Sequence, residues 1–247
     1  AWMQISVNGI AGSWESYMTS KTTTLPSGDG LKTISAIFKD RAGNISIPVS
    51  DSITLDTTAP ECTVTINAGA QYTNQRQVSL SLSATDALTN VTQMCFSNDN
   101  VTYSDAENYA TAKPWTLPLA DGTKTVYVKY KDSAGNWSSA VSDSIILDMT
   151  APPPPTITSP TTPTNINSQT INGTRSADTT AIIITCSTAT VGPVTYPTNT
   201  TYSCTLTNLT QGNNIITIKA QDAATNETTP ITAAIVLDTT APTGTIK

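Results

Sequence analysis

Aspartate and asparagine side chains are the residues of this 247-residue chain whose types and spacing best suit chemistry. Carboxylate and amide oxygens are the ligands that Ca²⁺ prefers. They recur in two similar sets, each made of an Asp in a Leu-Asp-x-Thr-Ala-Pro block, a second Asp 30 residues later and an Asp-x-x-x-Asn pair. If each set converges in the fold, its unpaired carboxylates would repel one another unless a cation bound there. The two sets are Asp56, Asp86, Asp132 and Asn136, and Asp148, Asp178, Asp222 and Asn226.

Plain turn chemistry is the alternative interpretation of the same residues. Asp and Asn favour turns because their side chains bond nearby backbone N–H groups and tolerate the left-handed conformation. None of the spacings forms an EF-hand loop. Both interpretations stay open at this point, and the sequence favours the turns.

Composition excludes several other classes of function. The chain has no histidine, which removes His-based catalysis and His metal ligands. Charged residues make up 12% and the net charge is −6, so we expect neither a coiled coil nor a nucleic-acid partner. No apolar run approaches the length of a membrane span, and we expect no membrane insertion. Without histidine there is no standard catalytic triad, so we expect no enzyme.

The four cysteines point to an oxidising compartment. Spacings of 33 and 18 residues, with no Cys-x-x-Cys, argue against a zinc or redox motif. We predict one disulfide in each complete repeat, with a buried free thiol as the alternative. The predicted pairs are Cys62–Cys95 and Cys186–Cys204.

An internal repeat organises the chain. Residues 38–60, 130–152 and 220–242 match one another, and their Leu-Asp-x-Thr-Ala-Pro blocks begin at Leu55, Leu147 and Leu237. The blocks are therefore 92 and 90 residues apart, which is the size of one β-sandwich domain. We expect a partial domain at 1–59, complete domains at 60–151 and 152–241, and the start of a further repeat at 242–247.

The elements that must position these residues are strands. Apolar residues alternate with Ser and Thr, as in Val78, Leu80, Leu82 and Ala84, which is typical of a strand with one buried face. Regularly spaced turns favour an all-β fold of tandem antiparallel sandwiches. In the second repeat we expect strands near 62–66, 78–84, 91–97, 114–117, 123–131 and 141–147. The proline-rich stretch 151–163 is predicted to be a stiff linker.

The pairing of an Asp-x-Ala-Gly-Asn turn with Leu-Asp-x-Thr-Ala-Pro resembles the bacterial immunoglobulin-like domains strung along large surface adhesins and other secreted cell-envelope proteins. The resemblance covers essentially all of the chain. It implies immunoglobulin-like sandwiches placed end to end, a location outside the cell, and Ca²⁺ at the junctions between domains. The third repeat departs from the pattern, because Asp222-Ala-Ala-Thr-Asn226 lacks the turn glycine. Its positive-φ position must fall on Asn226 or be rebuilt.

Two functions follow from these observations. The first is a non-catalytic spacer of a bacterial cell-surface adhesin or stalk, with neighbouring repeats as its partners. The second is a fibre subunit that assembles with identical chains by strand complementation, because the first domain lacks its opening strands. A third interpretation is a module that binds a host or prey surface glycan or protein, for which aromatic residues such as Trp2, Trp115 and Trp137 are candidates, although packing is the favoured role for them.

Overall fold

The computed structural model describes residues 1–158 and 160–244, so part of the predicted further repeat at 242–247 lies outside the described residues. The described chain is strand and turn, apart from one short 3-10 helix, η1 (Asn67–Gly69), which confirms the all-β prediction. Its contacts divide it into two compact units, residues 1–69, 79–115 and 125–144, and residues 70–78, 116–124 and 145–247. No helix of the described residues is long and apolar enough to cross a membrane.

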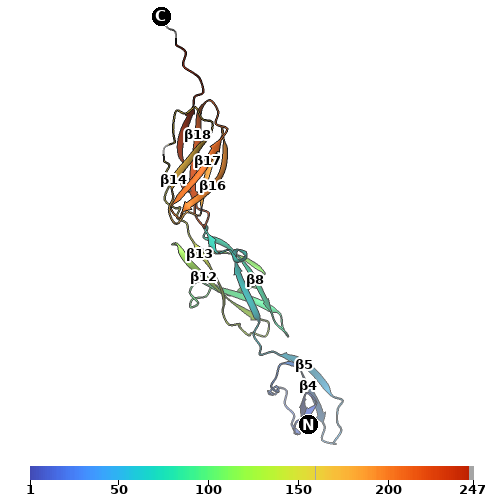
Figure 1. The fold of residues 1–247 in the computed structure, drawn as a ribbon. Coiled ribbons are helices and arrows are strands. Elements are labelled where there is room, and N and C mark those ends of the chain that lie inside the picture. Colours follow the sequence, from blue (N-terminus) through green and yellow to red (C-terminus); the bar gives the residue numbers. More distant parts are fainter. Residues whose placement is uncertain (159, 245–247) are drawn as a thin grey trace. The chain divides into compact units, whose positions relative to one another are not determined.

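The first stretch of chain forms a single antiparallel sheet (Figure 1). Its strands follow the order β2-β1-β4-β5, and β3 also pairs with β1. The long strand β4 pairs with β1 on one side, where Phe38 lies opposite Met3, and with β5 on the other, where Ala36 lies opposite Val49. The strands are β1 (Trp2–Val7), β2 (Ile10–Ala11), β3 (Glu15–Ser16), β4 (Gly30–Lys39) and β5 (Val49–Leu55).

The second repeat forms two sheets, of order β11-β8-β6 and β10-β9-β12-β13-β7. Its six main strands lie within two residues of the positions that the alternating pattern predicts, because each carries apolar residues on one face only. They are β6 (Glu61–Ile66), β7 (Tyr72–Thr73), β8 (Gln77–Thr85), β9 (Val91–Ser97), β10 (Glu107–Asn108), β11 (Ala112–Thr116), β12 (Gly122–Asp132) and β13 (Val141–Leu147).

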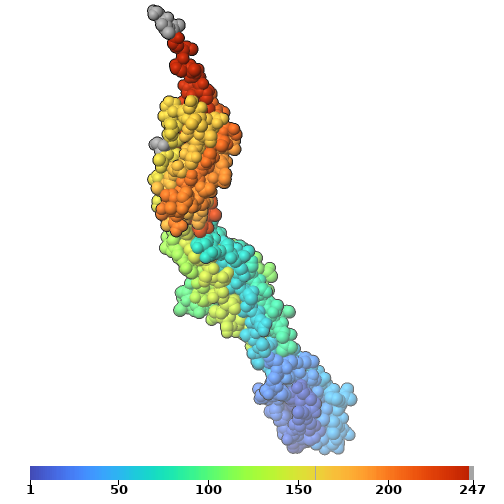
Figure 2. All heavy atoms as spheres, viewed as in Figure 1, coloured from blue at the N-terminus to red at the C-terminus, as the bar shows by residue number. Residues whose placement is uncertain are grey.

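The two sheets of the second repeat pack as a sandwich. Phe96 on β9 and Trp115 on β11 place their ring centroids 5.3 Å apart. The buried Tyr130 hydroxyl on β12 donates a hydrogen bond to the carbonyl oxygen of Thr63 on β6, at 3.1 Å. Side chains therefore fill the space between the strand layers. Figure 2 shows the outer surface of this repeat in cyan to yellow.

The third repeat forms two three-stranded sheets, of order β14-β17-β16 and β15-β18-β19. Their facing sides share one apolar core, which includes Ile171, Leu206, Ile218 and Leu237. Both complete repeats thus have the two-sheet strand order of an immunoglobulin-like sandwich. The strands are β14 (Gln169–Thr174), β15 (Ala181–Cys186), β16 (Thr190–Thr198), β17 (Thr201–Thr207), β18 (Gly212–Gln221) and β19 (Ile231–Leu237).

Part of the proline-rich stretch pairs with the third repeat and is not a stiff linker, which corrects that prediction. Pro152 and Pro155 are buried. The N–H of Thr156 bonds to the carbonyl oxygen of Thr174 at 2.9 Å, and the N–H of Thr158 bonds to that of Asn172 at 2.8 Å. Prolines can lie along a sheet edge because an edge strand needs only some of its N–H groups.

Candidate functional site

The turn between the last two strands of each repeat is built by its Asp-x-x-x-Asn pair. In the second repeat, Asp132 Oδ1 accepts the N–H groups of Gly135 and Asn136 at 2.6 and 2.8 Å. Asp132 Oδ2 accepts the amide Nδ2 of Asn136 at 2.8 Å. The pairs Asp40–Asn44 and Asp222–Asn226 repeat the arrangement at 2.8–2.9 Å. The turn interpretation of these residues is therefore confirmed.

The third turn is rebuilt without its glycine. Gly43 and Gly135 hold positive φ angles of 93° and 106° in the first two repeats. Thr225 occupies the same place in the third repeat, with φ of 70°. Of the two alternatives that the sequence left open, the turn is therefore rebuilt at Thr225, and Asn226 keeps the same side-chain bond to Asp222 as its counterparts make.

The same asparagines also hold the chain that enters each complete repeat. Asn136 Nδ2 donates to the carbonyl oxygen of Asp56 at 3.1 Å. Asn226 Nδ2 donates to the carbonyl oxygen of Asp148 at 2.8 Å. The Leu-Asp-x-Thr-Ala-Pro linkers at Asp56 and Asp148 are thus each bonded to the turn of the repeat that follows.

A second contact holds each linker from the other side. Asp29 accepts the N–H and hydroxyl of Thr57 at 3.0 and 2.7 Å, and the hydroxyl of Thr58 at 2.6 Å. Asp121 accepts the N–H of Met149 and the hydroxyl of Thr150 at 2.9 and 2.6 Å. The threonine hydroxyls keep the pKa values of both aspartates below their ordinary range. We call these contacts, together with the Asn bond, the linker clamp.

Reasoning from the sequence assigned no role to Asp29 and Asp121, although their offset of 92 residues was the available signal. Gln211 takes this position in the third repeat and bonds the N–H and hydroxyl of Thr239 at 3.0 and 2.9 Å. A glutamine can replace the aspartate because the clamp needs an acceptor oxygen rather than a charge.

Three of the predicted metal ligands do come together. One carboxylate oxygen of each of Asp56, Asp86 and Asp132 lies within 4.8 Å of the other two. Asp56 and Asp132 are buried, and Asp86 is partly exposed. Thr89 ties two of them together, since its hydroxyl donates to Asp56 Oδ2 at 2.6 Å and its N–H to Asp86 Oδ1 at 3.1 Å. A hollow of about 280 Å³ opens beside Asp86.

Hydrogen bonds favour the charged form of Asp132 in this cluster. Burial opposes ionisation of Asp132, but the amide and N–H of Asn136 and the N–H of Gly135 outweigh it and hold its pKa below the ordinary value. The three ion pairs of the described residues lie elsewhere, at Glu15, Glu107 and Glu227. The cluster therefore carries close carboxylates with no cationic partner among the described residues, and its oxygens fit a hard cation.

The second predicted ligand set is not gathered in the same way. Asp148, Asp222 and Asn226 share the linker clamp, but Asp178 is exposed and completes no three-carboxylate group within the described residues. The reason is a shift along the chain. Asp86 directly follows β8, whereas Asp178 lies four residues beyond the end of β14, where Arg175 takes the first loop position.

The predicted disulfides are not present, and all four cysteines are free. Cys62 shares a strand face with the buried Val64 and Ile66, while Cys95 alternates with the core residues Met94 and Phe96 and so lies on the opposite face of its sheet. The pair Cys62–Cys95 is therefore wrong.

Cys186 and Cys204 lie on strands of different sheets in the third repeat. The Sγ of Cys186 contacts the Thr188 hydroxyl at 3.4 Å, and the Sγ of Cys204 donates to the carbonyl oxygen of Gly192 at 3.3 Å. Burial raises the pKa of the Cys204 thiol, which lowers its reactivity.

Among the described residues, the aromatic side chains of the second repeat form no open platform. Trp115 and Tyr109 pack on the core rings Phe96 and Tyr130. Trp137 is 39% exposed, but the ammonium of Lys131 lies 5.7 Å from its ring centroid. Packing, rather than stacking on a sugar, accounts for these rings.

Comparison with known proteins gives likenesses of fold. No family model matches the chain, and no curated protein matches it. Fibronectin(III)-like modules of Clostridium thermocellum CbhA are 18% identical, cover 71% of this chain and 94% of theirs, and give a TM-score of 0.45. A tetra-tandem repeat from the extending region of a large adhesion protein is 23% identical. The match covers 96% of this chain and 67% of that one, with a TM-score of 0.31. Invasin, described as a bacterial integrin-binding protein, is 14% identical. The match covers 96% of this chain and 52% of that one, with a TM-score of 0.35.

Proposed function

We propose that the chain is a non-catalytic spacer segment of an extracellular protein of the bacterial cell surface, such as an adhesin or a stalk. The observation that carries the proposal is the linker clamp. Chemically equivalent contacts hold the linkers at Asp56 and Asp148 on both sides. A segment whose task is length needs linkers that stay ordered, and repeating one module with one clamped linker supplies this.

Small-angle X-ray scattering tests the proposal on the whole chain. A compact globule of this length would have a radius of gyration of about 18 Å. A spacer is expected to give a clearly larger value that does not change with protein concentration. A radius near 18 Å would contradict the spacer role.

A fibre subunit is the second candidate. It is favoured by the first sheet, which has no second sheet over it within the described residues. Sedimentation at rising concentration separates the two functions. Concentration-dependent filaments would favour the fibre, and a monomer at high concentration would refute it.

We also propose that Asp56, Asp86 and Asp132 bind a hard divalent cation, with Ca²⁺ preferred because all the available donors are oxygens. The cation would neutralise the facing carboxylates and so stabilise the chain around Asp56. Asp132 also serves the turn, so Asp86→Asn is the informative variant.

The test compares thermal melting in Ca²⁺ and in chelator. Ca²⁺ should raise the melting temperature of the native chain and leave the Asp86→Asn variant unchanged. Asp178→Asn is the matched control and should keep the full response, because Asp178 stands outside a cluster. An identical melt of the native chain in both conditions would refute the metal site.

A further inference from the structure

The first sheet is a copy of one sheet of the second repeat. Strands β1, β4 and β5 correspond to β9, β12 and β13, with Met3 opposite Phe38 where Met94 lies opposite Tyr130. The outer faces agree in detail. Thr33 and Ser52 hydroxyls lie 3.0 Å apart in the first sheet, and those of Thr125 and Ser144 lie 2.9 Å apart in the second repeat.

The inner faces differ in what covers them. Ile145 and Leu147 on β13 are fully buried. Their counterpart Ile53 is 55% exposed, and Leu55 is only partly buried. Ile34, Ala36 and Phe38 are likewise half-buried, where Val126, Val128 and Tyr130 are fully buried.

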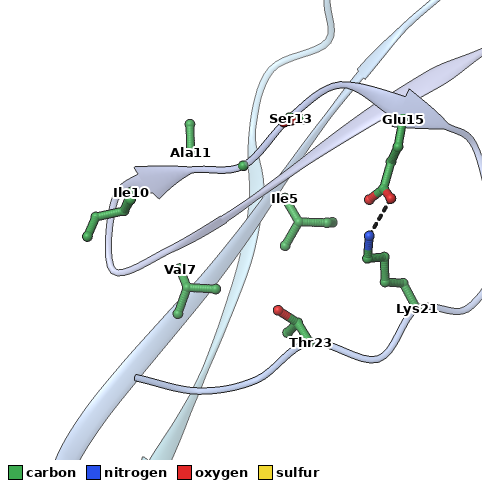
Figure 3. Close-up of a pocket in the computed structure, with 9 residues that line it drawn as sticks. Ile5, Val7, Ile10, Ala11, Ser13, Glu15, Lys21 and Thr23 are labelled. Carbon is green, nitrogen blue, oxygen red and sulfur yellow. Dashed lines mark hydrogen bonds and ion pairs between the residues drawn. The ribbon is translucent and has the colours of Figure 1, made fainter. Parts of the chain in front are cut away.

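Two hollows mark the uncovered face. One, of about 370 Å³, lies along β4 and β5 and is lined by Ile34, Ala36, Val49 and Asp51 among others. The other, of about 300 Å³, lies beside β1. Ile5, Val7 and Thr23 line it beside the ion pair of Glu15 and Lys21 (Figure 3).

The second repeat shows which elements do the covering. The Tyr130 hydroxyl donates to the carbonyl oxygen of Thr63 on β6. Strand β8 lies between β6 and β11, and the N–H of its Leu82 donates to the carbonyl oxygen of Thr111, just before β11, at 2.9 Å. The first stretch keeps the counterpart of β11 at residues 20–24, which form no strand. It has no counterpart of β6 and β8, so the elements lacking a match are two neighbouring strands.

One polar group marks the same place. Asp143 Oδ1 accepts the N–H of Ser144, and its Oδ2 accepts the N–H of Ile66 on β6 at 2.7 Å. Its counterpart Asp51 accepts the N–H of Ser52 at 2.8 Å, and its other oxygen has no hydrogen-bond partner within the described residues. Asp51 is therefore an acceptor placed where a covering strand would bring a backbone N–H.

We propose that the face of Ile5, Ile34, Ala36, Ile53 and Leu55 binds a two-stranded antiparallel unit of the β6–β8 type. The unit has alternating Val, Ile or Leu on one side and Ser or Thr on the other, as in β6 and β8. In the second repeat such a unit leads through residues 86–90 into β9, the counterpart of β1, so a test can join the unit to the chain in front of β1.

The experiment places a copy of residues 60–91 in front of Ala1 and follows hydrogen exchange by mass spectrometry. Exchange in residues 49–55 should slow by about tenfold or more, because opening would then expose Ile53 and Leu55 to water. Binding of a hydrophobic dye should fall in parallel. The matched control carries Leu80→Asp and Leu82→Asp in the added copy only, and should exchange like the original chain.

Asp51→Ala gives a second readout. It should speed exchange of residues 49–55 in the extended chain and have little effect in the original one. Unchanged exchange in an extended chain whose other repeats remain folded would overturn the proposal. So would strong protection of residues 49–55 in the original chain that is lost on dilution, because a second copy would then cover the face.

A converse variant covers the case in which the extended chain aggregates. Leu80→Asp in the original chain should let residues 141–147 exchange as fast as residues 49–55. Continued slow exchange of residues 141–147 would show that β6 and β8 are not what protects this kind of sheet, and would overturn the proposal.

Discussion

Asn136→Ala is the substitution that most sharply probes the linker clamp. It removes two side-chain bonds, from Nδ2 to the Asp132 carboxylate at 2.8 Å and to the Asp56 carbonyl oxygen at 3.1 Å. A bond to a charged group contributes about 1.5–3 kcal/mol and a neutral one about 0.5–1.5 kcal/mol. Because Asn136 is only partly buried, we take the lower part of both ranges and expect a loss of about 2 kcal/mol.

Urea unfolding followed by circular dichroism and by hydrogen exchange of residues 122–147 measures this loss. For a domain of this size, about 2 kcal/mol corresponds to roughly 10 °C in melting temperature. Local exchange is needed because the other repeats also contribute to the circular dichroism signal.

Asn44→Ala is the matched control. Asn44 makes the same turn bonds to Asp40, at 2.9 and 2.8 Å, but it is exposed and has no bond to a linker carbonyl among the described residues. Its replacement should cost well under 1 kcal/mol. If both substitutions cost the same within about 0.5 kcal/mol, the linker bond has no energetic weight and the clamp argument is refuted.

Five further outcomes are expected. Thr225→Gly should stabilise the third repeat by about 1 kcal/mol in urea, because it relieves a threonine at φ of 70°. Gly173→Ala should cost about 3 kcal/mol or more, since its Cβ would lie 2.6 Å from the Tyr202 ring, and a folded variant of native stability would contradict this packing. Asp132 has a folded-state pKa below the unfolded value of about 3.9, so its stabilisation is complete above that pH and is lost as pH falls through the folded pKa, which urea midpoints should show. Tyr202 has its pKa raised to about 12 by burial, so stability should fall between about pH 10 and 12. Thiol titration of the unfolded, unreduced chain should find four free thiols. A count of two free thiols would instead support the predicted disulfide Cys186–Cys204.

Much of the fold was predictable because strand alternation is a local property. Val78, Leu80 and Leu82 are buried as their spacing indicates. The linker contacts were not predictable, since they join Asp29 to Thr57 and Asn136 to Asp56 through turns that only the folded sheets bring together.

The predicted ligand residues come together where the loop lengths of the repeats agree and stay apart where they differ. Asp86 begins its loop and meets Asp56 and Asp132, whereas a fixed offset of 92 places Asp178 too far beyond its strand. The disulfide Cys62–Cys95 failed for a different reason. Alternation already placed Cys95 on the face opposite Met94, and the presence of two cysteines in one repeat does not override the pleat.

Backbone ¹⁵N relaxation of the linker amides tests the central claim most directly. The N–H groups of Thr57, Thr58, Met149 and Thr150 all donate to aspartate oxygens of the clamp or of the linker itself. A clamped linker predicts order parameters near 0.85 for these four amides, equal to those of the strands. Values below about 0.6 would show that the linkers move freely and would contradict the account of the chain as a spacer built on ordered linkers.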